Sequence, residues 1–390
     1  GNFGDAASPL QSRIIGAAKV TGRLGNGLSV GFIDAITQRE QGTQLRTIEP
    51  QTNYAVLRLQ QDLRGGNSGI GLMVTNTARQ TDQWTQAILR GNAWSGGLDG
   101  RHRFGNNRWQ VSGQMAGSHV TGTAKSIALT QRSNVHLYQR PDADHLTYDS
   151  TRTSLSGMMV QGALEKQGGG ITRLHTSVWY MTPGFEINDL GFRTRSDEMG
   201  QSLWFALRPV TPVAMFRRAQ ANFNAWQFRN TSGLLLGNGG NVNGWGELKN
   251  FWNVNGGIGF NDLVPAYSDR DSRGGPEIFR PARLNSWFNL NGDGRKSVAP
   301  NIGGSVGRRL DGLGSSWNIH TGANVRFGTQ FNGSINLNYT RNIDDQQWNG
   351  NFVDNGVTSY TFARLYQRTG SVTARINYTL TPTLSVESYV

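Results

Sequence analysis

The chain has 390 residues, no cysteine and a formal net charge of +12. The absence of cysteine excludes a disulfide framework, thiolate metal sites and covalent c-type haem attachment. Only 36% of the residues are hydrophobic, which is little for a large dry core. No run approaches the roughly 18 apolar residues that a membrane-spanning helix needs. A barrel with an outer apolar band and a wet interior avoids both limits.

About nineteen segments read as β-strands. Residues 331–340 (FNGSINLNYT) are typical: Phe, Gly, Ile, Leu and Tyr alternate with Asn, Ser, Asn, Asn and Thr. Successive side chains of a strand point to opposite faces, so such a segment has one apolar and one polar face. The segments start near Ile14, Leu28, Tyr54, Gly69, Ala93, Arg108, Ser154, Thr172, Ser202, Ala219, Asn241, Phe251, Leu284, Val298, Trp317, Phe331, Thr361, Ser371 and Thr383.

Strands of about ten residues that are apolar outward and polar inward are typical of a transmembrane β-barrel. The sequence therefore predicts an all-β fold, an antiparallel barrel of about 18–20 strands that crosses the outer membrane many times. No linker or shift in composition divides residues 1–390, which predicts a single barrel domain. A soluble all-β protein is disfavoured, because the chain has few hydrophobic strands with which to build a closed core.

The predicted connections alternate between short and long. Glycine-rich turns fall at 25–27, 65–67, 105–107, 168–170 and 292–294, and long connections cover about 37–53, 121–151, 183–200, 261–281 and 341–359. Outer-membrane barrels have short periplasmic turns and long extracellular loops. The first turn is short, so the strand near Ile14 is expected to run toward the periplasm. An upward strand is then expected before it, and the chain is interpreted as a fragment.

Several segments resemble one known family. They are 15–22 (IGAAKVTG), 117–122 (GSHVTG), 138–145 (YQRPDADH), 151–157 (TRTSLSG), 183–192 (PGFEINDLGF) and 273–276 (RGGP). Together they resemble the C-terminal barrel of domain-of-unknown-function family 5916. The resemblance implies an outer-membrane location and a missing upstream β-sandwich domain similar to a carbohydrate-binding module. It implies no catalytic residues.

Strand parity places a set of arginines and asparagines on the polar faces. We predict that they line a lumen, and that the excess of arginine favours anionic or polar solutes. Because the arginines are spread along the whole chain, nucleic acid is not an expected partner. The predicted lumen residues are Arg58, Arg101, Arg103, Asn253, Asn255, Arg326, Asn336, Asn338 and Arg375.

The tryptophans divide into two groups. Trp94, Trp109, Trp204, Trp252 and Trp317, with Tyr378, are expected at strand ends or on apolar faces, where interfacial aromatic residues lie. Trp245 and Trp287 share parity with asparagines and are expected to point into the lumen. They could form a track for a sugar or a peptide, although simple filling of the lumen is the more common role of such rings.

One loop suggests a cation. Asp142, Asp144 and Asp149 lie within eight residues, and carboxylates in a loop bind hard cations such as Ca²⁺. The alternative is that these carboxylates pair with Arg132 or Arg140. Similarly, residues 269–273 (DRDSR) look like a charged loop paired with itself. No other cofactor is expected.

We expect no enzyme activity. Ser118 and His119 are sequence neighbours, so on a strand they point to opposite faces and cannot form a nucleophile–base pair. The apolar residues Ile127, Leu129, Val135 and Leu137 of the longest connection need burial, which predicts that this segment folds into the barrel.

The leading functional hypothesis is a channel or translocation pore for polar or anionic solutes. The alternative is a plugged membrane anchor or scaffold that displays a binding domain or partner protein at the cell surface. In both cases the expected partners are the lipid bilayer, lipopolysaccharide, and periplasmic or surface proteins.

Overall fold

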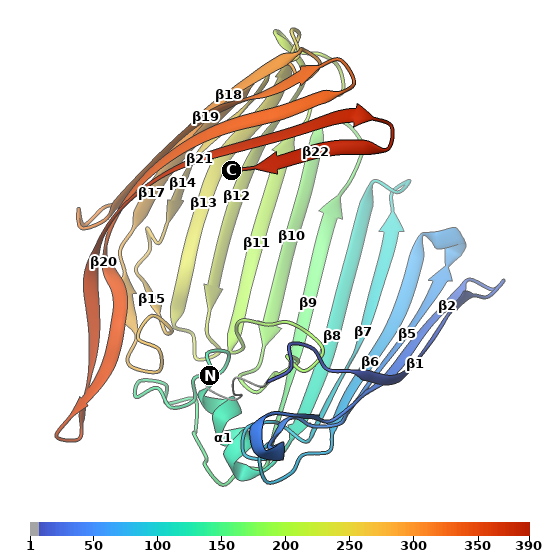
Figure 1. Cartoon of the computed structure of the whole chain (residues 1–390), viewed down its shortest axis with the longest axis vertical. Helices are drawn as coiled ribbons and strands as arrows, with labels where there is room; N and C mark the ends of the chain where they lie inside the picture. Colours follow the sequence, from blue (N-terminus) through green and yellow to red (C-terminus); the bar gives the residue numbers. More distant parts are fainter. Residues whose placement is uncertain (1–7) are drawn as a thin grey trace.

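The computed structural model describes residues 8–390, which form one long antiparallel sheet (Figure 1). Eighteen strands belong to it, and each pairs with the next one along the chain. They are β1 Ile14–Arg23, β2 Leu28–Thr37, β5 Thr52–Leu63, β6 Ser68–Arg79, β7 Asn92–Phe104, β8 Trp109–Thr121, β9 Ser154–Lys166, β10 Thr172–Met181, β11 Glu198–Leu207, β12 Phe216–Arg229, β13 Leu235–Leu248, β14 Asn253–Asn261, β17 Arg283–Asn291, β18 Val298–Arg309, β19 Ser315–Phe327, β20 Phe331–Asp354, β21 Val357–Thr381 and β22 Leu384–Tyr389.

Short elements occupy the connections. Thr123 caps the helix α1, because its hydroxyl accepts a hydrogen bond from the Ser126 N–H. No helix among residues 8–390 is both long enough and apolar enough to cross a membrane. The short elements are β3 Glu40–Gln41, η1 Thr43–Leu45, β4 Thr47–Glu49, η2 Arg64–Gly66, α1 Ala124–Arg132, β15 Ala266–Ser268 and β16 Ile278–Arg280.

The predicted all-β antiparallel architecture is confirmed, and eighteen strands lie within the predicted range. The sequence suggested nineteen because two segments, starting near Thr361 and Ser371, are one continuous strand, β21. Figure 1 shows that the sheet is strongly curved, like a barrel wall. In the described part of the chain, β1 pairs only with β2 and β22 only with β21, so the two outer strands are not joined by hydrogen bonds.

Long connections gather at one end of the sheet, the lower end in Figure 1. Successive connections of an antiparallel meander alternate between its two ends. The long ones, 38–51, 80–91, 122–153, 182–197 and 262–282, all leave the same end, and the predicted glycine-rich turns lie at the other. Four of the five predicted long connections are confirmed, and the connection at 80–91 was missed.

The prediction of a fifth long connection was wrong. Residues 341–359 belong to a hairpin whose strands, β20 and β21, continue beyond the sheet to a two-residue turn. Asn355 and Gly356 both have positive φ angles, 48° and 82°, as an Asn-Gly hairpin turn requires. The polar composition of this stretch favoured a loop, but a strand that projects past its neighbours has no need of an apolar face.

The two faces of the sheet differ sharply. We call inner the face on which connections 122–153 and 182–197 pack, and outer the opposite face. Large apolar side chains of the outer face are widely exposed, up to 69% for Ile258. An exposed apolar surface of this extent marks contact with another apolar phase. Examples in chain order are Val20, Ile70, Leu98, Met115, Val178, Val242, Ile258, Phe288, Val306, Ile335 and Val372.

Candidate functional site: the inner face of the sheet

Strand register places the predicted lumen residues together. Residues directly opposite each other in an antiparallel pair share a face, and Asn255 lies opposite both Trp245 and Asn289. Followed from strand to strand, the register puts all nine predicted arginines and asparagines, and both predicted tryptophans, on the inner face. That they line a conducting lumen stays a prediction.

The strands β1 to β8 carry arginines on this face that are matched by carboxylates. Arg58 makes a two-pronged contact with Asp99, in which Nη2 donates to Oδ1 at 3.0 Å. Asp62 accepts from Arg101 at 3.2 Å and from Arg23 at 2.8 Å. Two of the three arginines predicted here are therefore largely neutralised, which reduces the positive field that the sequence suggested.

The other three predicted arginines are not paired with a carboxylate in the described part of the chain. Arg103 donates to the Gln110 amide oxygen at 3.1 Å, and Arg375 lies over the Tyr389 ring at 4.9 Å. Within residues 8–390, Arg103, Arg326 and Arg375 make no ion pair. They therefore contribute unpaired positive charge to the inner face, as does exposed Arg283.

The strands β12 to β14 and β17 to β20 carry amides instead. The Asn224 amide donates to Asn241 at 2.8 Å, and the Asn289 amide donates to Asn255 at 2.9 Å. Such contacts link neighbouring strands by side chains as well as by backbone. We call this surface the amide wall, and its asparagines are Asn222, Asn224, Asn241, Asn243, Asn255, Asn285, Asn289, Asn318, Asn336 and Asn338.

Three long connections form a cap over the inner face. This loop cap comprises residues 122–153, 182–197 and 262–282. The predicted burial of Ile127 is confirmed, since it is fully buried among Val120 and Leu155 of the inner face. Leu137 is also buried, but Leu129 is 43% exposed. Phe185 packs so closely on β9 that a side chain at Gly157 would overlap its backbone.

A buried carboxylate, Asp269, joins the parts of the loop cap. Its side chain is 2% exposed, forms an ion pair with Arg140 at 2.9 Å and accepts a hydrogen bond from Arg195 at 2.6 Å. Arg270 donates in turn to the carbonyls of Val135 and Ser196. Within residues 269–273, Asp269 pairs with Arg270 at 3.9 Å, as the sequence suggested, but its closest partners lie outside this loop. The charges of Asp269 and Arg270 connect distant segments of the chain.

Burial and charge shift the pKa values in this cluster. Burial by itself would raise the pKa of Asp269, but Arg195, Arg270 and Arg140 bring it below the ordinary value. Burial and repulsion by Arg195 lower the pKa of Arg270 to about 10. The cluster therefore depends on Asp269 remaining ionised.

A second carboxylate residue, Glu186, connects the loop cap to strand β8 of the inner face. It accepts from His136 at 2.9 Å and lies 3.7 Å from Arg90, while its backbone N–H donates to the Ser118 hydroxyl at 2.9 Å. Burial would raise the pKa of Glu186, but the hydrogen bond from His136 and the charge of Arg90 bring it below its usual value.

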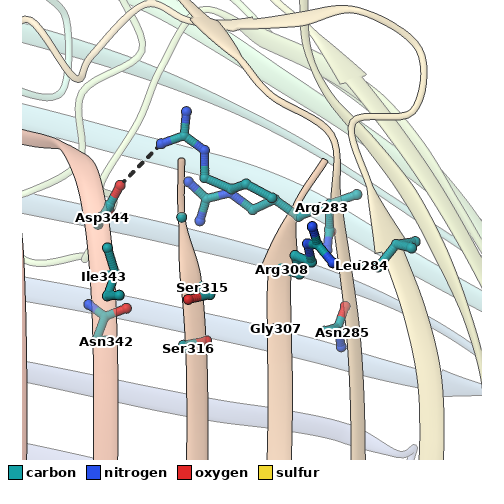
Figure 2. Close-up of a pocket in the computed structure, with 13 residues that line it drawn as sticks. Arg283, Leu284, Asn285, Gly307, Arg308, Ser315, Ser316, Asn342, Ile343 and Asp344 are labelled. Atoms are coloured by element: carbon teal, nitrogen blue, oxygen red, sulfur yellow. Dashed lines mark hydrogen bonds and ion pairs between the residues drawn. The ribbon is translucent and has the colours of Figure 1, made fainter. Parts of the chain in front are cut away.

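A polar pocket of about 300 Å³ opens where the amide wall meets the long connections (Figure 2). Asn285, Ser316 and Asn342 come from β17, β19 and β20 and line it with amides and a hydroxyl. Arg309 is held by Asp311, Asp344 and Asp345. Exposed Arg283 lies opposite Arg309 in the register. We call this cavity the mouth pocket.

The carboxylates of the predicted calcium loop have separate partners, and calcium binding at this loop stays a prediction. Asp142 accepts from the Glu277 N–H, whereas Asp149 accepts from the backbone and hydroxyl of Thr151. No group of three or more His, Cys, Asp or Glu side chains within residues 8–390 is arranged to hold a metal ion, so Asp142, Asp144 and Asp149 do not converge. Arg140 pairs with Asp269 and Asp197 rather than with these three.

Two further expectations concern single side chains. Ser118 and His119 lie on opposite faces: Ser118 contacts Glu186, and His119 bonds to Ser156 at 2.7 Å. The expected separation is confirmed.

Trp204, expected on an apolar face or at a strand end, instead lies on the inner face, where its indole N–H donates to Asn222 at 3.1 Å.

Comparison with known proteins gives a family but no established activity. The sequence model of the family described as "Domain of unknown function (DUF5916)" matches residues 5–389. No curated protein matches the sequence significantly.

Several solved structures are similar in outline. The siderophore receptor PirA from Acinetobacter baumannii has a TM-score of 0.48 at 9% identity, covering 92% of this chain and 61% of that one. The siderophore receptor PiuA from the same organism has a TM-score of 0.46 at 10% identity, covering 97% and 70%. The anion-selective porin from Comamonas acidovorans has a TM-score of 0.36 at 10% identity, covering 97% and 100%. The chain thus spans less than two thirds of the length of PirA.

Proposed function

The chain belongs to the family of domain of unknown function DUF5916, and from that premise we propose that it is an outer-membrane barrel that passes polar solutes. The observation that carries the proposal is the continuous separation of the two faces through eighteen strands. The outer face would contact the lipid bilayer and lipopolysaccharide. The inner face, with its arginines and amides, would line the path of the solute.

The proposed orientation follows from the connections. Short turns would face the periplasm and the loop cap the outside, as is usual for such barrels. The mouth pocket then lies at the external entrance of the amide wall. The loop cap narrows this entrance from the side of β6 to β10, where Phe185 contacts β9 and Glu186 contacts β8.

A plugged anchor or scaffold is the second candidate. The observation in its favour is the loop cap itself, whose buried ion pairs hold three long connections against the inner face. In that case the barrel would display a surface or periplasmic partner protein and would conduct nothing.

Single-channel recording separates the two candidates. In a planar bilayer across a KCl gradient, the purified barrel should show stepwise openings with a modest preference for anions. The preference is modest because Asp62 and Asp99 neutralise arginines of the inner face. The double variant D62N/D99N should raise the anion-to-cation permeability ratio several-fold, since lumen charge sets selectivity.

The matched control removes one carboxylate outside the proposed path. Asp354 is exposed at the end of β20, so D354N should leave the permeability ratio unchanged. A barrel that inserts and folds but never opens would favour the scaffold. Equal shifts in D354N and in D62N/D99N would contradict the assignment of the inner face.

A further inference from the structure

The amide wall carries no charge in its middle. Between Glu247 near the short turns and Arg283 and Arg309 at the mouth pocket, the inner-face residues of β12 to β14 and β17 to β19 are amides, hydroxyls, glycines, tryptophans and His320. The opposite wall, by contrast, carries Arg58, Asp99 and Arg101. The two halves of the inner face are thus built for different chemistry.

The side-chain amides of this wall have donors and acceptors that their contacts with the protein do not use. The Asn289 side chain donates once to Asn255 and accepts once from the ring of His320 at 3.0 Å. An asparagine side chain has two donor hydrogens and two acceptor lone pairs, so Asn289 retains one donor and one lone pair. Neighbouring amides such as Asn318 and Asn338 are similarly linked at 2.6 Å. The surface presents ordered, uncharged donors and acceptors side by side.

Two tryptophans of the inner face lie against glycines of the neighbouring strand. Trp287 is paired across strands with Gly257, and a Cβ atom at that glycine would lie 2.6 Å from the ring. Trp226 is paired with Gly239 in the same way, with a corresponding distance of 2.5 Å. Because glycine has no side chain, each ring can approach the backbone of the neighbouring strand closely. A third inner-face tryptophan, Trp245, lies opposite Asn255 and is 39% exposed.

The rings and amides continue from the mouth pocket. Along β17 the inner-face residues are Asn285, Trp287 and Asn289 in succession, and Asn285 lines the pocket. Asn318 and Asn338 follow the pocket residues Ser316 and Asn342 on the neighbouring strands. A polar path therefore leads from the external opening to the tryptophans.

We propose that the amide wall is a binding track for uncharged saccharides. Pyranose rings have an apolar face that stacks on an aromatic ring, and hydroxyl groups at their edges that both donate and accept hydrogen bonds. Trp226, Trp245 and Trp287 supply the stacking surfaces, and the amides supply the bonding partners. An anionic solute would find no positive charge in the middle of this wall. This inference rests on the proposed function and names the class of solute.

Binding is measured first on the detergent-solubilised barrel, where no open pore is needed. Maltohexaose and cellohexaose serve as probes, in titrations followed by calorimetry and tryptophan fluorescence, with pentaglycine as an uncharged peptide probe. At least one saccharide should bind, and W287A should weaken it about three- to ten-fold, the range expected for loss of one aromatic contact. W287F should restore most of the affinity, because a ring remains.

Two further variants distinguish a loss of binding from a general folding defect. W245A removes a ring that faces no glycine and should also weaken binding, while W94A removes an outer-face tryptophan, 50% exposed, and should not. Absence of binding by either saccharide, equal binding of pentaglycine, or equal losses in W94A and W287A would overturn the proposal. If the barrel conducts ions but binds neither saccharide, the proposed channel is retained and the proposed saccharide track is refuted. A barrel that binds without conducting refutes the channel alone.

Discussion

Replacing Asp269 by asparagine should release the loop cap. The substitution leaves Arg140, Arg195 and Arg270 close together without the carboxylate that they share. Removing one partner of a buried ion pair costs about 3–5 kcal/mol. Backbone amides of residues 133–152 should then exchange with deuterium roughly a hundred- to several-thousand-fold faster, because each 1.4 kcal/mol is a factor of ten.

The matched control is D271N, two residues away, where the carboxylate is exposed. It should leave exchange unchanged. In D269N the amides of β12 to β14 should also keep their protection, because the strands hold one another through the sheet ladder. Equal exchange in D269N and D271N would show that the cap does not depend on this cluster.

Acid should release the cap in the same way. The pKa values of Asp269 and Glu186 are lower in the folded protein than their ordinary values of 3.8 and 4.5. The stability they contribute is therefore complete above those ordinary values and is lost as the pH falls through the lowered ones. Protection of residues 133–152, measured relative to the intrinsic exchange rate at each pH, should fall below about pH 4, and less so in D269N.

A lysine on the outer face should prevent insertion. Ile258 of β14 is 69% exposed, and a lysine near the middle of a bilayer costs a barrel about 2–4 kcal/mol. I258K should therefore shift the urea midpoint for folding into phospholipid vesicles to a clearly lower concentration. The measurement is the folded fraction at each urea concentration.

The control uses the same strand. N255K places an identical charge on the inner face, where it loses one amide hydrogen bond, worth about 1 kcal/mol. Its folding should be affected much less than that of I258K. If the two variants were equally impaired, the outer face would not be the lipid-contacting face.

Much of the fold could be predicted from alternation alone. Period-two patterning determines which residues share a face within a strand, so parity sufficed to assign Arg58, Asn255 and Trp287 each to the polar face of its own strand. Glycine-rich turns revealed the short connections. The Asn355-Gly356 turn was also visible in the sequence, but the polar strands around it were interpreted as a loop.

The contacts between distant segments could not be predicted in this way. Arg58 and Asp99 are 41 positions apart, and His136 and Glu186 are 50 apart. Such pairs depend on the register of separate strands and on the path of long connections. Alternation within one strand contains neither. The neutralised arginines and the loop cap therefore emerged only from the structure.

Thiol labelling shows most directly which face of the sheet meets water. The chain contains no cysteine, so N289C and F288C each introduce a single thiol on neighbouring residues of β17. In barrels reconstituted into vesicles, a charged, water-soluble thiosulfonate should react with N289C and leave F288C unmodified. Reaction of F288C with protection of N289C, or equal reaction of both, would contradict a membrane barrel with a polar interior.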